Sequence, residues 1–129
     1  MTPKEVILNS FKNLLENPDA DQSSIEKWFS PQYCQNVDGK EIDYDGFKAH
    51  YIALREATKS IKVDIVDIVS EGGRVFTNHI VNIIKKNGEQ TQLKVLALFK
   101  VENNKIMSCD ELTYLLKGID SDADLGSRK

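Results

Sequence analysis

The second half of the chain alternates between apolar and polar residues with the two-residue period of β-strands. Four such runs follow one another between about residues 60 and 116, and short turns rich in Gly, Asn and Glu separate them. Turns of this length join antiparallel neighbours. We therefore predict a four-stranded antiparallel meander built from the runs SIKVDIVDIV, RVFTNHIVNII, TQLKVLALFKV and KIMSCDELTYLL.

The first half of the chain has the wider apolar spacing of helices. Helices are predicted over about residues 4–16, 20–29 and 47–58, and a short hairpin that turns at Asp38-Gly39 lies between the second and the third. Helices followed by a meander are an α+β order. Because long antiparallel strands twist and curl, we expect a curved antiparallel sheet wrapped around the N-terminal helices. A pocket is expected at its open mouth.

Length and composition suit one domain. The chain has 129 residues, 40% of them apolar, and we expect residues 1–117 to form a single domain and residues 118–129 a polar tail. The net charge of −3 does not provide the basic surface that nucleic acid requires. The sequence lacks an apolar run of about 18 residues, the length that crosses a membrane, and also lacks the pattern of a secretory signal. We therefore expect a cytoplasmic protein with no nucleic-acid or membrane partner.

The two cysteines do not indicate a metal or cofactor site. Cys34 and Cys109 lie 75 positions apart and form neither a CxxC pair nor a zinc-type cluster. We expect two free thiols, no metal ion and no cofactor.

Strand alternation assigns side chains to the two faces of the predicted sheet. The face of the third run that should be concave holds only apolar side chains, namely Leu93, Val95, Ala97, Phe99 and Val101. The matching face of the preceding strand holds His79. In the last strand, Ile106 follows the turn and should anchor the core, which places Asp110 inward and Glu111 outward. A β-bulge in this strand would exchange the two acids.

This order of elements resembles the nuclear transport factor 2-like fold, a cystatin-like cone, and within it the SnoaL-like domains. The likeness spans about residues 6–116 and rests on Trp28-Phe29, Tyr33, Asp38-Gly39, Gly46-Phe47, His50, Gly72-Gly73 and Asp110-Glu111-Leu112. The superfamily includes cyclases, isomerases, dehydratases, hydrolases and transport adaptors, so the resemblance implies a fold more than a function. Ketosteroid isomerases and SnoaL-like cyclases use pocket acids for proton transfer, and the resemblance implies such a role for Asp110.

Two ionisable residues on the predicted concave face are the catalytic candidates. His79 and Asp110 lie among apolar residues, where a charge costs free energy unless it is paired or used. Either could abstract a proton from a carbonyl compound while Tyr33 or Tyr51 donates to the developing oxyanion. The alternatives are a core histidine satisfied by a neighbour, and an aspartate that is paired or exposed at the mouth.

The predicted pocket has a helical side and a sheet side. Its walls are Trp28, Tyr33, Phe47, His50 and Tyr51 from the first side, and Val63, His79, Val95, Ala97 and Asp110 from the second. We expect it to bind a small apolar molecule, with cyclase- or isomerase-type proton transfer on a carbonyl compound. The alternative is a non-catalytic ligand-binding or protein-interaction module on the same fold.

The outer face of the predicted sheet is also apolar in places. Alternation assigns to it Phe76, Ile80, Ile84, Leu96 and Leu98. Such a patch is larger than a soluble monomer usually exposes. We therefore expect a homodimer in which two of these faces pair.

Overall fold

The structure, a computed structural model, describes residues 1–118, so the predicted polar tail lies outside the described residues except for Gly118. The helices are α1 (Pro3–Ser10), the π-helical segment η1 (Phe11–Glu16) that continues it, α2 (Ser23–Trp28) and α3 (Tyr44–Ala57). The strands are β1 (Phe29–Val37), β2 (Lys40–Asp43), β3 (Thr58–Glu71), β4 (Arg74–Lys85), β5 (Gln90–Glu102) and β6 (Lys105–Lys117). No helix within residues 1–118 is long and apolar enough to cross a membrane.

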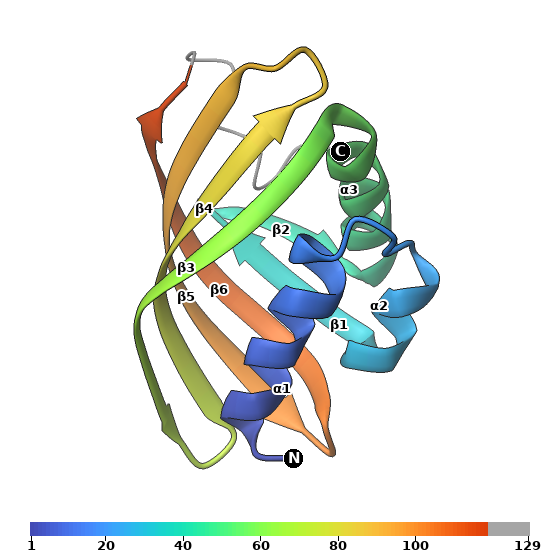
Figure 1. Cartoon of the computed structure of the whole chain (residues 1–129). Coiled ribbons are helices and arrows are strands. Elements are labelled where there is room, and N and C mark those ends of the chain that lie inside the picture. The colour runs from blue at the N-terminus through green and yellow to red at the C-terminus, as the bar shows by residue number, and fades with distance from the viewer. Residues whose placement is uncertain (119–129) are drawn as a thin grey trace.

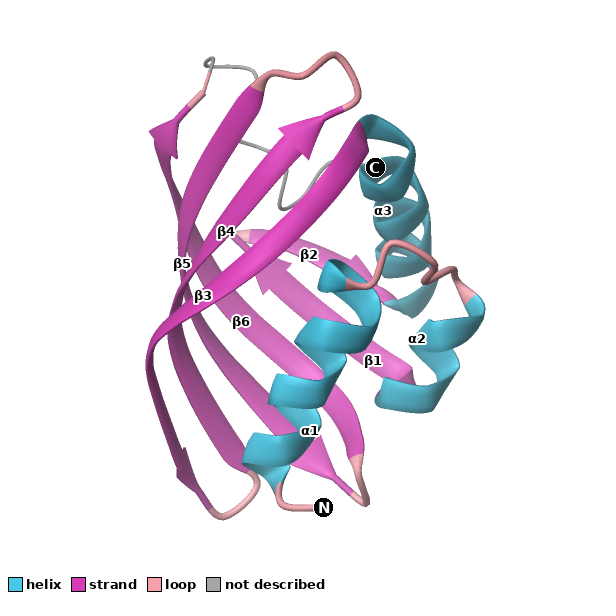
Figure 2. Ribbon diagram, in the orientation of Figure 1, coloured by secondary structure: helices cyan, strands magenta, loops and turns pink. Residues whose placement is uncertain are grey.

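The strands form one curved sheet in the order β2-β1-β6-β5-β4-β3. The predicted meander of β3 to β6 is confirmed as a run of antiparallel neighbours. The sheet curves around α1 and η1. The helix α3 lies at the end of the sheet where β3 begins (Figures 1 and 2). This arrangement confirms the predicted α+β cone, and its interior lies between the concave sheet face and the helices.

Polar caps fix where two of the helices begin. Thr2 and Glu5 form a capping box, in which the Thr2 hydroxyl accepts from the Glu5 amide at 3.1 Å and the Glu5 carboxylate accepts from the Thr2 amide at 3.0 Å. At α3 the Asp43 carboxylate accepts from the Gly46 amide at 2.8 Å. Asp43 therefore starts this helix at Tyr44, three residues before the start that its apolar spacing predicts.

Alternation correctly predicts the faces of β4 and β5. Thr77, His79, Val95 and Ala97 are all buried on the concave side. The two strands pair without interruption from Arg74 opposite Lys100 onward, so the two-residue period holds along their whole length.

A bulge in β6 makes the predicted direction of Asp110 wrong. Val101 pairs with Ile106 but Lys100 pairs with Ser108, so Met107 is an extra residue on β6 and reverses the alternation beyond it. Ile106 is buried as predicted, but Asp110 then faces the outer side, and Glu111 faces inward.

Candidate functional site

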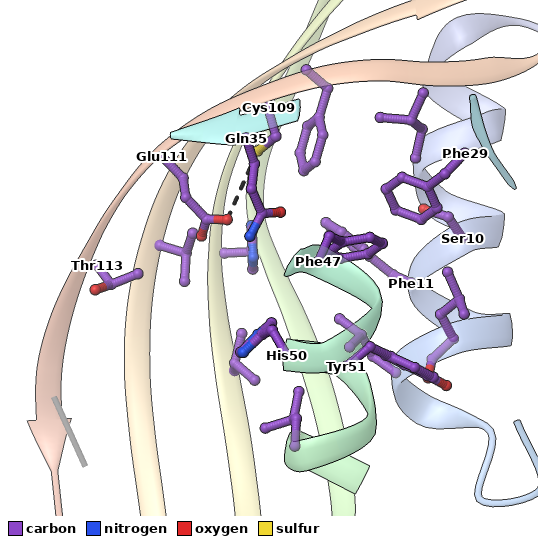
Figure 3. Close-up of a pocket in the computed structure, with 18 of the residues that line it drawn as sticks. Ser10, Phe11, Phe29, Gln35, Phe47, His50, Tyr51, Cys109, Glu111 and Thr113 are labelled. Atoms are coloured by element: carbon purple, nitrogen blue, oxygen red, sulfur yellow. Dashed lines mark hydrogen bonds between the residues drawn. The ribbon is translucent and has the colours of Figure 1, made fainter. Parts of the chain in front are cut away.

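A cavity lies between the concave face of the sheet and the helices η1 and α3. Its volume is about 140 Å³, which is close to that of a buried apolar cavity that accepts a single aromatic ring. Most of its wall is apolar, and the polar side chains among its lining residues include Gln35, His50, His79, Glu111 and Thr113. Figure 3 shows Gln35 and Glu111 from the sheet and His50 from α3 around the same space.

Glu111 reaches the cavity from β6. Burial raises the pKa of its carboxyl to about 7, the charge of Asp38 adds to this, and a hydrogen bond from Cys109 acts against it. The Cys109 thiol donates that bond to Oε1 at 3.8 Å. A carboxyl with a pKa near neutrality can both accept and return a proton at physiological pH.

The turn between β1 and β2 holds this part of β6 in place. The Asp38 amide donates to the Glu111 carbonyl at 3.0 Å. Its carboxylate accepts from the Thr113 amide at 2.7 Å and also from the Thr113 hydroxyl. The Asp38-Gly39 turn, predicted from sequence as a hairpin, therefore also anchors the backbone on both sides of the Glu111 side chain.

His79 is a neutral side chain of the cavity wall. Its Nδ1 lies 2.8 Å from the Thr77 hydroxyl, and its ring centroid is 4.9 Å from that of Phe11. Burial lowers the pKa of the imidazole to about 4. The ring is thus satisfied by a neighbour, as one of the two interpretations predicts, and it also borders the cavity. Its catalytic role stays a prediction.

The two tyrosines hydrogen-bond to the protein itself. The Tyr33 hydroxyl donates to Gln35 Oε1 at 2.7 Å, and the Tyr51 hydroxyl donates to the Leu14 carbonyl at 2.8 Å. A phenol carries one proton to donate. The prediction that one of them donates to a ligand oxyanion is therefore not supported by these contacts.

The helix α3 is fastened to η1 at the edge of the cavity. Beside the Tyr51 contact, the Arg55 guanidinium donates to the carbonyls of Leu15, Asn17 and Pro18 at 2.9–3.1 Å. Leu15 is in the last turn of η1, where carbonyls lack partners within the helix, and Asn17 and Pro18 directly follow that helix. The two helical walls of the cavity are thereby held together.

The structure brings together six of the ten residues predicted for the pocket. These six line the cavity, namely Tyr33, Phe47, His50, Tyr51, His79 and Val95. Trp28 and Ala97 are buried in the core cluster, and Val63 packs against that cluster, but none of the three is among the cavity-lining residues. Asp110 is exposed and lines a separate groove on the outer face.

Four polar residues of the wall, Ser10, Gln35, Glu111 and Thr113, were not assigned to the pocket by sequence reasoning. Gln35 follows Tyr33 by two positions, so strand alternation places both on one face and could have identified it. For Glu111, unbroken alternation along the last strand predicted the outer face of the sheet and not the face that lines the cavity. Within residues 1–118, His, Cys, Asp and Glu side chains do not gather in groups of three that could hold a metal ion.

Comparison with known proteins settles the family. The model of the SnoaL-like domain matches residues 12–109. The chain belongs to the SnoaL-like domain family. An uncharacterised protein of Schizosaccharomyces pombe is 36% identical over 107 residues, which are 83% of this chain and 82% of that protein.

Solved structures share the fold at low sequence identity. A candidate polyketide cyclase of Streptomyces antibioticus, IdmH, has a TM-score of 0.74 at 13% identity, covering 98% of both chains. A candidate polyketide cyclase of Acidithiobacillus ferrooxidans has a TM-score of 0.72 at 18% identity, covering 86% of this chain and 87% of that one. An LEH-like epoxide hydrolase of Mycobacterium tuberculosis has a TM-score of 0.69 at 19% identity, covering 86% and 84%. These structures confirm the predicted cone fold, and the family match confirms the predicted SnoaL-like resemblance.

Proposed function

We propose that this protein binds a small, mainly apolar carbonyl compound in its cavity and that Glu111 transfers a proton on that compound. The observation that carries the proposal is the position of Glu111, a carboxyl on a wall that is otherwise largely apolar. Its pKa of about 7 supports the proposal, because proton transfer is most efficient when the pKa lies near the working pH. The volume of about 140 Å³ favours a ligand with a single ring.

The chemistry follows from the groups on the wall. The Glu111 carboxylate takes a proton from the carbon next to the ligand carbonyl, and the electron pair of that C–H bond moves to form an enolate. If the Glu111 carboxyl first exchanges its proton with solvent, reprotonation of the same carbon gives hydrogen exchange. If Glu111 instead delivers the proton to a conjugated position, the product is an isomer. His79, neutral at pH 7 because its pKa is about 4, is a second site on the wall that could accept a hydrogen bond.

Hydrogen exchange of a simple ring ketone tests this role. Cyclohexanone in D₂O is followed by ¹H NMR with wild-type protein, with Glu111→Gln and with Asp110→Asn. We expect the wild type to accelerate loss of the α-hydrogens and Glu111→Gln to reduce that acceleration about 100-fold or more, the size of a general-base contribution. Asp110→Asn, its neighbour on the outer face, is the matched control. The charge of Asp110 makes the smallest of the contributions to the pKa of Glu111, so this variant should exchange at close to the wild-type rate.

The same experiment separates the second candidate function. Equal exchange rates for the wild type and Glu111→Gln would contradict proton transfer by Glu111. Binding of cyclohexanone without accelerated exchange in any variant would favour the non-catalytic ligand-binding module, a function that the largely apolar cavity also supports.

We also propose that the protein forms a homodimer through the outer face of the sheet. Phe76, Leu96, Leu98, Leu112 and Tyr114 are exposed apolar side chains on β4, β5 and β6. Their registers place them on neighbouring positions of one face, since Phe76 lies opposite Leu98 and Leu96 opposite Leu112. The cytoplasmic location remains a prediction from the sequence.

A further inference from the structure

The amide of Gln35 is the polar group beside Glu111. Gln35 is only 5% exposed and extends from β1 into the cavity. It pairs with Cys109 on β6, two residues before Glu111 on the same face. Figure 3 shows the Gln35 and Glu111 side chains next to each other, both directed into the cavity.

Tyr33 fixes which end of this amide faces the cavity. Its hydroxyl donates to Gln35 Oε1 at 2.7 Å, and burial raises the pKa of the phenol well above its usual range, so the proton stays on the oxygen. With Oε1 engaged, Nε2 is the end of the amide left for a ligand. The reverse orientation would bring the lone pairs of Oε1 toward the carboxylate of ionised Glu111, which is electrostatically unfavourable.

The other hydroxyls of the wall do not compete for this role. Tyr33 and Tyr51 each donate their single proton to the protein. The Ser10 hydroxyl donates to the Ile7 carbonyl at 2.8 Å, and the Thr113 hydroxyl donates to the Asp38 carboxylate. Among the hydroxyl and amide groups of the wall, the Gln35 amide is therefore the donor beside Glu111 that a ligand oxygen can meet.

Building on the proposed function, we propose that Gln35 Nε2 donates a hydrogen bond to the carbonyl oxygen of the ligand and that Tyr33 is the residue that positions it. When Glu111 removes the α-proton, negative charge develops on that oxygen, and a donor already aimed at it stabilises the enolate. The pair thus selects an enolisable ketone or aldehyde, which presents an acceptor oxygen to Gln35 and an adjacent acidic C–H bond to Glu111.

The carbonyl stretching frequency of bound ¹³C=O-labelled cyclohexanone reports this contact directly. In the wild type we expect the infrared band of the bound ketone to shift to lower frequency than in an apolar solvent. Gln35→Met, which keeps the length of the side chain and removes the amide, should lose that shift. It should also lower kcat for α-hydrogen exchange by about 100-fold, typical of a lost oxyanion donor, with a smaller change in KM.

Two further variants show whether a lost carbonyl shift in Gln35→Met comes from the missing amide or from a destabilised fold. Gln35→Met leaves the buried Tyr33 hydroxyl without its acceptor, which destabilises the fold, so the double variant Tyr33→Phe/Gln35→Met removes both partners and should show the same loss of shift. Tyr33→Phe alone frees the amide to turn and should give a smaller shift than the wild type, with a lower kcat and little change in KM.

The outcomes separate this inference from the function on which it rests. An unchanged carbonyl frequency in bound Gln35→Met would overturn the role of Gln35. A normal shift in Glu111→Gln together with undiminished exchange would overturn proton transfer by Glu111 while leaving the Gln35 contact intact. If the wild type does not bind cyclohexanone, both the proposed function and this inference are wrong.

Discussion

Burial shifts the pKa values of Glu111 and His79, two ionisable side chains of the cavity wall, in opposite directions. Burial disfavours the charged form of any group, and it raises the pKa of Glu111 to about 7 while it lowers that of His79 to about 4. Between these two values both side chains are neutral. The wall gains a negative charge from Glu111 as the pH rises through about 7, so near neutral pH the carboxyl is present in both its protonated and its ionised form.

Glu111 makes the folded state less stable as the pH rises. Its folded pKa of about 7 lies above the ordinary value of 4.5, so the folded protein holds this proton more tightly than the unfolded chain. Its contribution to stability is present below pH 4.5 and is lost as the pH rises through 7. Relative to Glu111→Gln, the unfolding free energy of the wild type should therefore fall by up to about 3 kcal/mol over this range.

Urea denaturation at a series of pH values measures that difference. Asp110→Asn is the control and should stay close to the wild type, because the charge of Asp110 makes only the smallest contribution to the raised pKa of Glu111. His79 acts in the opposite sense, because its lowered pKa means that stability is lost as the pH falls from 6.5 toward 4. The wild-type profile should therefore be flatter than that of Glu111→Gln. Parallel profiles for those two proteins would contradict the burial of an ionisable Glu111.

At the scale of elements, the accuracy of sequence reasoning depended on how regular each strand was. The faces of β4 and β5 followed from alternation because their pairing is uninterrupted. In β6 the bulge at Met107 is set by pairing with β5, and the residues on either side of it carry no Gly, Pro or other local mark. The sequence analysis therefore placed Asp110 on the concave face and Glu111 on the outer face, which is the reverse of what the structure shows. The cavity wall from α3 was predicted from its apolar stripe, which holds Phe47 and Tyr51. The wall from η1, formed by Phe11, Leu14 and Leu15, was not assigned to the pocket, because the apolar spacing predicts a helix there but not which part of the interior it borders.

Cysteine accessibility tests the direction of β6 after the bulge. With the bulge, Cys109 faces inward and is buried while Cys34 is exposed; without it, Cys109 would face outward. The variant Cys34→Ser should react slowly with a thiol reagent when folded and rapidly in urea, both because Cys109 is covered and because burial raises the pKa of its thiol. Cys109→Ser should react rapidly in both states. Fast reaction of folded Cys34→Ser would contradict this register.

At the scale of the whole molecule, the curved sheet uses its two faces differently. The concave face encloses the cavity, and the convex face presents exposed apolar side chains. The bulge enlarges the second surface, because the same reversal that turns Glu111 inward turns Leu112 and Tyr114 outward beside Leu96 and Lys94. Sequence reasoning predicted the β4 and β5 part of this surface and did not include the β6 part.

Substitution of a charge into this face tests the proposed homodimer. Wild-type protein at micromolar concentration should have the mass of a dimer by light scattering, and Leu96→Asp should have that of a monomer, because the aspartate would be buried without a partner in the interface. Ile52→Asp is the matched control, since Ile52 is about as exposed on α3 as Leu96 is on β5. A monomeric wild type would contradict the proposal.

The most direct test of the account is a ¹³C NMR titration of the glutamate carboxyl carbons, with and without cyclohexanone. We predict one carboxyl that titrates near pH 7 in the wild type, in line with the raised pKa of Glu111, and that is missing in Glu111→Gln. Cyclohexanone should raise its midpoint further, because an apolar ligand displaces water from the carboxyl. A spectrum in which every glutamate titrates near its ordinary pKa, or in which the carboxyl near pH 7 does not respond to the ketone, would contradict the claim that Glu111 faces a ligand-binding cavity.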